Sequence, residues 1–165
     1  MTEPLGDSVA RAVGRLLSDR QESVAVGESC TGGLVTARLT AVPGASAYVL
    51  GGVVAYADEV KVEFLAVERG LLRRHGAVSG PAAEAIAAGA AARLGAHWGV
   101  GVTGIAGPGG GSEEKPVGTV WVAVSHNGRS WSERHHFPGD RDSVRRASVD
   151  VALELLLRRL QADPY

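Results

Sequence analysis

The feature that most constrains the fold is an early alternation of short apolar segments with segments of helical spacing. Residues 23–27 form an uncharged run, residues 48–56 are rich in β-branched and aromatic side chains, and residues 98–103 are again apolar. Residues 34–41 and 58–66, which follow the first two runs, carry helical patterns. Strands that alternate with helices form sheets covered by helices on both faces. We therefore expect an α/β protein, a three-layer α/β/α sandwich.

The second half of the chain adds antiparallel strands. Residues 118–125 and 130–137 flank an Asn-Gly pair, which tolerates the positive φ angles of a two-residue hairpin turn. The sheet is therefore expected to be mixed, with residues 48–56 as a central strand. Ser79 and Asp140 are suited to cap an alanine-rich helix that ends at residue 94 and a closing helix that ends at residue 160. A helix with apolar spacing also opens the chain, and the whole length of 165 residues fits one domain.

The charge balance argues against a nucleic-acid partner. Seventeen basic and eighteen acidic side chains leave a formal charge of -1, so no broad positive field is available to bind a phosphate polymer. A small phosphorylated ligand remains compatible, because a few groups can hold one phosphate. No membrane span and no metal-binding spacing is recognisable, so neither a membrane, a metal nor another cofactor is expected. The single cysteine and the lack of a signal-peptide pattern favour the cytoplasm.

Ser29 is the first candidate for chemistry. It follows the strand 23–27 in the turn Glu-Ser-Cys-Thr-Gly-Gly, ahead of a helix. On such a turn the amides of Thr31, Gly32 and Gly33 could bind an oxyanion beside the serine hydroxyl. The turn resembles the Gly-x-Ser-x-Gly elbow of hydrolases but has threonine at the last position. A serine that only caps the following helix is the alternative interpretation.

A nucleophilic serine needs a base, and Lys61 is a better candidate than the histidines, which fall on predicted loops or edges. It lies about one helical turn beyond Tyr56, near the strand end that carries Ser29. Burial favours the neutral amine of a lysine, which is the form that accepts a proton. The alternative is a solvated lysine that pairs with Asp58 or Glu59.

Two further segments could contact a ligand. Residues 104–116 form a glycine-dense loop whose free amides could surround an anion, although such loops often only turn corners. Arg141 and Arg145 share one face at the start of the last helix. Such a pair can grip a phosphate or a carboxylate, or it can equally form surface ion pairs with Asp142 or Glu154.

Several of these segments together resemble the CinA C-terminal family, in matching order and spacing over nearly the whole chain; they are residues 28–33, 56–61, 75–79, 104–120 and 137–141. The resemblance implies hydrolysis of nicotinamide mononucleotide to nicotinate mononucleotide and ammonia, without metal, in the recycling of pyridine nucleotides. It implies Ser29 as nucleophile, Lys61 as base and Tyr56 as their hydrogen-bonding partner. The implied binding residues are the oxyanion donors Thr31, Gly32 and Gly33 and the ligand contacts Thr103, Gly104 and Arg145, with a less defined role for Arg141.

Alternatives to this assignment stay open. The chain could be a non-catalytic nucleotide-binding module or subunit of the same fold. Cys30 could replace the serine as nucleophile, since helix N-termini activate thiolates. Many members of the family carry an additional N-terminal domain related to molybdopterin-binding proteins, with a separate nucleotide-cleaving activity, and we do not expect that domain or activity in this chain. Helices faced with alanine favour a homo-oligomer.

Overall fold

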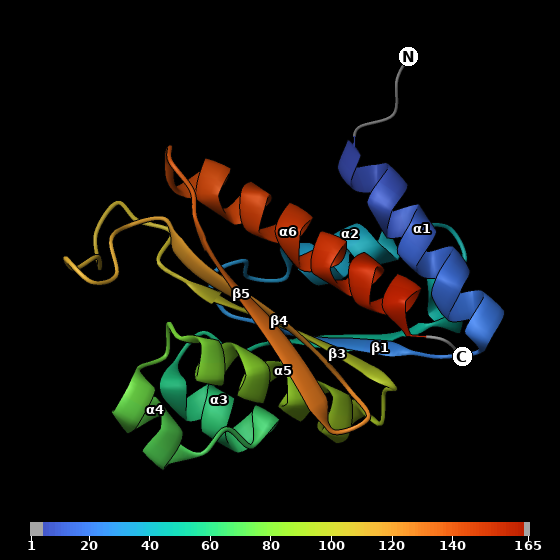
Figure 1. Ribbon diagram of the computed structural model, residues 1–165, viewed down its shortest axis with the longest axis horizontal. Coiled ribbons are helices and arrows are strands. Elements are labelled where there is room, and N and C mark those ends of the chain that lie inside the picture. The colour runs from blue at the N-terminus through green and yellow to red at the C-terminus, as the bar shows by residue number, and fades with distance from the viewer. Residues whose placement is uncertain (1–4, 164–165) are drawn as a thin grey trace.

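The computed structural model describes residues 5–163 and contains a five-stranded mixed sheet between two layers of helices (Figure 1). The strand order is β2-β1-β3-β4-β5. The first three strands are parallel to one another, β4 runs antiparallel to β3, and β5 runs antiparallel to β4. The strands are β1 (Val24–Glu28), β2 (Val49–Val54), β3 (Trp98–Gly104), β4 (Thr119–His126) and β5 (Arg129–His136). The expected three-layer α/β/α architecture with a mixed sheet is confirmed.

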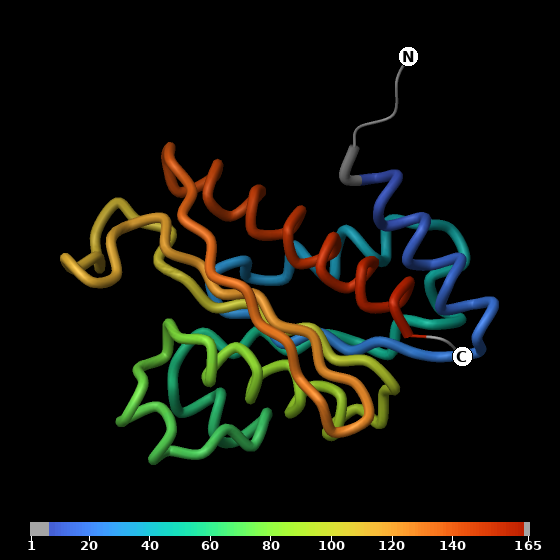
Figure 2. The backbone as a smooth tube through the Cα atoms, viewed as in Figure 1, coloured from blue at the N-terminus to red at the C-terminus, as the bar shows by residue number. Residues whose placement is uncertain are grey.

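The helices divide between the two faces of the sheet, as the backbone trace shows (Figure 2). One face carries α1 (Leu5–Arg20), α2 (Leu34–Thr40) and α6 (Arg141–Ala162); the other carries α3 (Asp58–Leu65), α4 (Arg69–His75) and α5 (Gly80–Leu94). A short 3-10 turn, η1 (Ala45–Ala47), precedes β2. Among the described helices, none is long and apolar enough to cross a membrane.

The alanine-rich helix α5 packs unusually close to the sheet. A Cβ atom on Gly99 would lie 1.9 Å from the carbonyl oxygen of Ala87, and one on Gly101 would lie 2.3 Å from that of Ala83. Backbone therefore rests on backbone at this contact, which only residues without bulk permit. The other face holds the larger core, in which valines of β1, β3 and β4 pack against leucines of α1, α2 and α6.

The bounds of most helices and strands agree with the expected ranges to within one or two residues. Ser79 accepts a hydrogen bond from the amide of Ala82 at the start of α5, and Asp140 accepts one from the amide of Ser143 at the start of α6, so both predicted caps are confirmed. Asn127 has a φ of 49° in the hairpin turn, as expected. The sequence patterns missed α4, because seven residues with three basic side chains in the last turn show no apolar period.

The segment 48–56 was expected as a central strand, and that expectation is wrong. Strand β2 lies at the edge of the sheet and pairs only with β1. Its residues alternate between half-buried and exposed, so that Leu50 and Val54 are 48% and 46% exposed. An uncharged run looks the same in sequence whether one or both of its edges are paired. Helix α2 approaches β2 closely at Gly52, where a Cβ atom would lie 2.0 Å from Thr36 Oγ1.

Candidate active site

The candidate site lies at the carboxyl ends of the three parallel strands. Glu28 at the end of β1 pairs in register with Val54 of β2 and with Val102 of β3. The segments that follow these strands therefore start side by side, and they carry Ser29, Tyr56 and the glycine-dense loop. This arrangement follows the general rule that ligands collect at the carboxyl ends of parallel strands.

Ser29 sits on a tight turn that joins β1 to α2. The residue is 8% exposed, and its amide donates to the carbonyl oxygen of Val102 at 3.0 Å, which anchors the turn to β3. Within residues 5–163 its hydroxyl makes no hydrogen bond to another group. The capping interpretation is wrong, because the N-cap of α2 is Gly33, in a left-handed conformation with φ 104°. The hydroxyl is thus available for another task.

The amides of this turn differ in their availability. The amide of Gly32 donates to the carbonyl oxygen of Ser29 at 3.1 Å, so it is engaged inside the turn. The amides of Thr31 and Gly33 have no acceptor in the described part of the chain. Of the three amides expected to bind an oxyanion, two are therefore free to do so in this conformation.

Lys61 is buried rather than solvated, with only 1% of its surface exposed. Its Nζ donates to the carbonyl oxygen of Tyr56 at 3.0 Å and lies 3.5 Å from Asp58 Oδ1. The alternative of a solvated lysine paired with Asp58 is therefore right about the pairing and wrong about the solvation. Within the described chain no hydrogen bond joins Lys61 to Ser29. The two segments are nevertheless adjacent, because the amide of Ala55 donates to the carbonyl oxygen of Glu28 at 2.7 Å.

Arg141 and Arg145 both reach into the site from the first turns of α6. Arg141 donates to the carbonyl oxygen of Gly107 at 2.8 Å and to Tyr56 Oη at 2.9 Å. Arg145 donates to the carbonyl oxygens of Cys30 and Thr31 at 3.1 and 3.2 Å. In residues 5–163 neither arginine pairs with a carboxylate.

The alternative of surface ion pairs applies instead to the neighbouring Arg146. Its guanidinium lies 2.9 Å from Asp142 Oδ2, and its side chain is 73% exposed. Arg141 and Arg145 therefore bring two positive charges to the site that are surrounded by neutral oxygens. Guanidinium groups in this state are well suited to bind an anion.

Thr103 and Gly104 lie at the end of β3 below these groups. Thr103 is 1% exposed and donates through Oγ1 to the carbonyl oxygen of Ala77 at 2.8 Å, which ties the segment before α5 to the sheet. A Cβ atom on Gly104 would lie 2.7 Å from Val120 and 3.1 Å from Cys30 Sγ. Both residues are thus packed closely beside the Ser29 turn, and their predicted contact with a ligand stays a prediction.

Cys30 is a poor candidate for the nucleophile. Burial raises the pKa of its thiol to about 11, an effect that the nearby Arg145 only partly offsets. The thiol is therefore protonated at neutral pH, and a protonated thiol is a weak nucleophile. This disfavours the alternative in which Cys30 carries the reaction.

The loop of residues 104–116 is anchored at several points. The amide of Ile105 donates to the carbonyl oxygen of Thr119 at 2.9 Å, and Lys115 Nζ donates to the carbonyl oxygen of His75 at 3.0 Å. Between these anchors the residues 109–114 are exposed. The loop therefore forms a fixed rim of the site with an exposed tip.

Glu28 was missed as a site residue. Its side chain is 1% exposed and accepts hydrogen bonds from Thr31, Val35 and Thr36. A carboxylate that ends an otherwise apolar strand, with threonine three and eight residues later, is the signal that the sequence offered.

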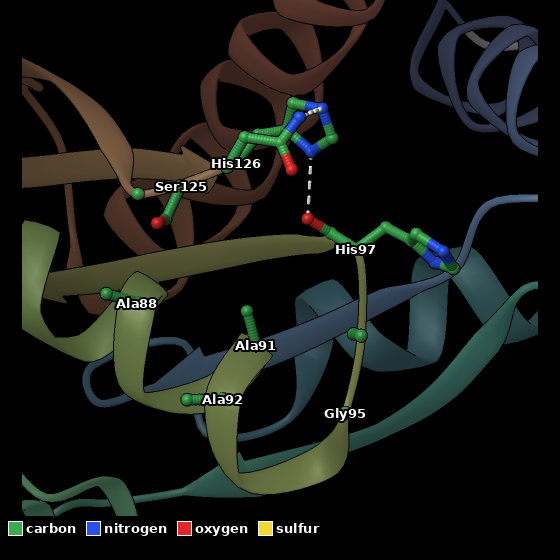
Figure 3. Close-up of a pocket in the computed structure, with 10 residues that line it drawn as sticks. Ala88, Ala91, Ala92, Gly95, His97, Ser125 and His126 are labelled. Carbon is green, nitrogen blue, oxygen red and sulfur yellow. Dashed lines mark hydrogen bonds between the residues drawn. The ribbon is translucent and has the colours of Figure 1, made fainter.

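A pocket of about 540 Å³ lies at the other end of the sheet, between α5 and the β4–β5 hairpin (Figure 3). It is lined mainly by alanines of α5 and by Ser125, His126 and His97, and none of the predicted site residues contributes to it. Within the described residues, no three His, Cys, Asp or Glu side chains gather as a metal site. This pocket is therefore separate from the predicted site residues around Ser29.

Comparison with known proteins gives one consistent result. The profile of the CinA C-terminal domain matches residues 6–160. A CinA-like protein of Mycobacterium marinum is 52% identical over 156 residues, which is 94% of this chain and 36% of that protein. One from Anaeromyxobacter sp. (strain K) is 53% identical over 150 residues, 91% of this chain and 37% of that protein. The chain thus spans little more than a third of these relatives.

Solved structures agree with the sequence relatives. A CinA superfamily protein from Klebsiella pneumoniae superposes with a TM-score of 0.92 at 32% identity, covering 97% of this chain and 100% of that one. The competence/damage inducible protein CihA from Agrobacterium tumefaciens superposes with a TM-score of 0.91 at 39% identity, covering 98% of both chains.

Proposed function

The chain belongs to the CinA C-terminal domain family, and on that basis we propose that it hydrolyses nicotinamide mononucleotide to nicotinate mononucleotide and ammonia. The observation that carries the proposal is the pair of cations Arg141 and Arg145, without carboxylate partners in the described chain, beside the free hydroxyl of Ser29. This combination suits a substrate that has both an anionic group and an electrophilic carbon.

In the proposed reaction, Ser29 Oγ attacks the carboxamide carbon while the neutral amine of Lys61 takes the hydroxyl proton. The oxyanion accepts hydrogen bonds from the amides of Thr31 and Gly33. Lys61 then gives its proton to the departing nitrogen, so that ammonia leaves and a nicotinoyl ester remains on the serine. Water, deprotonated by Lys61, hydrolyses the ester, and the proton returns to Ser29. For the first step Lys61 must exchange its contact with the Tyr56 carbonyl for Ser29.

In this proposal the two arginines bind the phosphate of the substrate. Arg141 and Arg145 lie one helical turn apart on α6, and their present partners are neutral oxygens. A phosphate dianion is a stronger acceptor than a carbonyl or a phenol, so Arg141 can exchange a neutral partner for the substrate at little cost. Tyr56, which is 60% exposed, lies at the mouth of the site and would contact the substrate there.

A non-catalytic nucleotide-binding module is the second candidate. One observation favours it, namely that Lys61 donates to Tyr56 and faces Asp58 instead of Ser29. A module of this kind would bind the nucleotide without releasing ammonia. Calorimetric titration with nicotinamide mononucleotide, combined with an ammonia assay on the same sample, separates the two candidates.

The direct test is ammonia release by the purified protein from nicotinamide mononucleotide in the presence of a chelator. We expect turnover by the wild type and by Cys30→Ala, and no turnover by Ser29→Ala with an unchanged melting temperature. A folded Ser29→Ala protein that keeps its activity would overturn the mechanism. Free nicotinamide and nicotinamide riboside, tested beside the mononucleotide, show whether the phosphate is required.

The setting of this activity is also a proposal. The near-neutral charge supports a small-molecule substrate and no nucleic-acid partner, and we propose a cytoplasmic homo-oligomer that serves pyridine nucleotide recycling. Light scattering on the purified protein measures its mass in solution, and a monomer would remove the oligomer from the proposal.

A further inference from the structure

Glu28 holds the two sides of the Ser29 turn together. Its Oε1 accepts hydrogen bonds from Thr31 Oγ1 at 2.7 Å and from the amide of Val35 at 2.9 Å. Its Oε2 accepts from the amide and the hydroxyl of Thr36 at 3.1 and 2.7 Å. Residue 31 lies within the turn, and residues 35 and 36 lie in α2, so one carboxylate joins β1, the turn and the helix.

The carboxylate also caps the N-terminus of α2. The first amides of a helix have no partner inside it and need an acceptor from elsewhere. The N-cap residue of α2 is Gly33, which has no side chain to offer. Glu28 supplies the acceptor from the preceding strand, and this fixes the start of α2 relative to the end of β1. The residues between them, including Ser29, are thereby held at both ends.

Two other contacts hold the same turn from outside. Arg145 binds the carbonyl oxygens of Cys30 and Thr31, and the amide of Ala55 binds the carbonyl oxygen of Glu28. Since Tyr56 follows Ala55 directly, Glu28 is also joined to the segment that leads to Lys61. The position of Glu28 therefore bears on the nucleophile and on its base together.

A neutral side chain cannot replace this arrangement. An ionised carboxylate only accepts hydrogen bonds, and all four bonds to Glu28 come from donors. Glutamine has the same shape but turns an NH₂ group toward one of the two donor pairs. Because the side chain is 99% buried, no water can compensate for the lost acceptor.

We propose that Glu28 is a positioning residue that sets the geometry of Ser29 and of the free amides of Thr31 and Gly33. This inference rests on the proposed amidohydrolase function. Small displacements of a reacting group lower rates steeply, by about 100-fold for a shift near 1 Å. We therefore expect Glu28→Gln to lower kcat about 100-fold while KM for nicotinamide mononucleotide changes less than about threefold.

The matched control is Glu22→Gln, the same chemical change at the other end of the sheet. Glu22 accepts a hydrogen bond from Trp98 Nε1 at 2.7 Å, which a glutamine oxygen can also accept, so the change removes a charge without touching the site. We expect Glu22→Gln to keep the wild-type kcat. If the two variants lower kcat equally at equal melting temperatures, Glu28 has only a structural role and the proposal fails.

A second pair of variants keeps the test decisive if Glu28→Gln does not fold. Thr36→Ser keeps the hydroxyl that donates to Glu28, and Thr36→Val removes it at nearly constant volume. We expect kcat to fall about tenfold in Thr36→Val and to be largely restored in Thr36→Ser. Equal kcat values in these two variants would overturn the proposal.

Amide hydrogen exchange separates this inference from the proposed function, because it needs no substrate. In Glu28→Gln, or in Thr36→Val if that protein must stand in for it, the hydrogen-bonded amides of residues 32 and 34–36 should exchange at least tenfold faster than in Glu22→Gln. Unchanged exchange would overturn the positioning role. Absence of ammonia release by the wild type would overturn the proposed function, and the exchange result would still decide whether Glu28 holds the turn.

Discussion

Arg141 provides the sharpest test of the proposed phosphate contact. Within residues 5–163 the guanidinium has neutral hydrogen-bonding partners only, Gly107 and Tyr56, so the truncation Arg141→Ala leaves none of the described carboxylates without its counterion. A hydrogen bond between charged groups contributes about 1.5–3 kcal/mol. Since about 1.4 kcal/mol corresponds to a factor of ten, the expected rise in KM for nicotinamide mononucleotide is about 10- to 150-fold.

The assay compares two substrates that differ only in the phosphate. Ammonia release is measured with nicotinamide mononucleotide and with nicotinamide riboside, and the effect of Arg141→Ala on kcat/KM is determined for each. We expect a large loss with the mononucleotide and a loss below about threefold with the riboside. Arg146→Ala is the control, because this neighbouring arginine is 73% exposed, is paired with Asp142 and should affect neither substrate.

An equal loss with both substrates would refute the phosphate contact. The Arg141 side chain would then act through Tyr56 Oη, to which it donates at 2.9 Å, and not through the substrate's anionic group. Tyr56→Phe distinguishes that outcome further, since it removes the oxygen that Arg141 binds and leaves the aromatic ring in place.

Three further predictions concern stability. Because burial raises the pKa of Cys30 from 9.0 to about 11, the folded state holds the thiol proton more tightly than the unfolded state does. This contribution to the free energy of unfolding is fully present below pH 9 and is lost, by about 3 kcal/mol, as the pH rises to 11. The free energy of unfolding of the wild type, measured by urea titration, should therefore fall over this range more than that of Cys30→Ala. Gly99→Ala should lower the melting temperature by about 10 °C or more, because its Cβ atom would lie 1.9 Å from a backbone oxygen, whereas Gly109→Ala, with nothing within 4 Å, should not. Ser79→Ala removes the cap of α5 and should lower the free energy of unfolding by about 1 kcal/mol, measured by urea titration.

The parts of the fold that sequence predicted are those with local causes. The caps at Ser79 and Asp140 and the turn at Asn127 each depend on contacts within three residues, and all three are confirmed. The edge position of β2 depends on which strand pairs with β1, which is decided by contacts far apart in the chain. The close approach of α5 to Gly99 is likewise a contact between separate elements, for which the alanine-rich composition of the helix is the signal in the sequence.

The difference between local causes and contacts of distant segments also explains which features of the site were predicted from the sequence. Parallel strands bring their ends together, so the proximity of the Ser29 turn to the Tyr56 segment followed from the strand predictions alone. The engagement of the Gly32 amide with Ser29 depends on the turn conformation, which no residue pattern specified. Glu28 was missed, although it ends an apolar strand, because its partners at 31, 35 and 36 face it only after α2 has folded back over the end of β1.

The charges of the site agree with the proposal that a chain of nearly zero net charge selects an anionic substrate. The site combines two cations, Arg141 and Arg145, with a buried carboxylate, Glu28, that is occupied by its own hydrogen bonds. Since the overall formal charge is -1, the attraction is confined to this edge of the sheet. Screening limits such a local field to about 10 Å at 0.1 M salt. A phosphate that lies against the two arginines is within that range, so raising the salt concentration should increase KM for the mononucleotide far more than for the riboside.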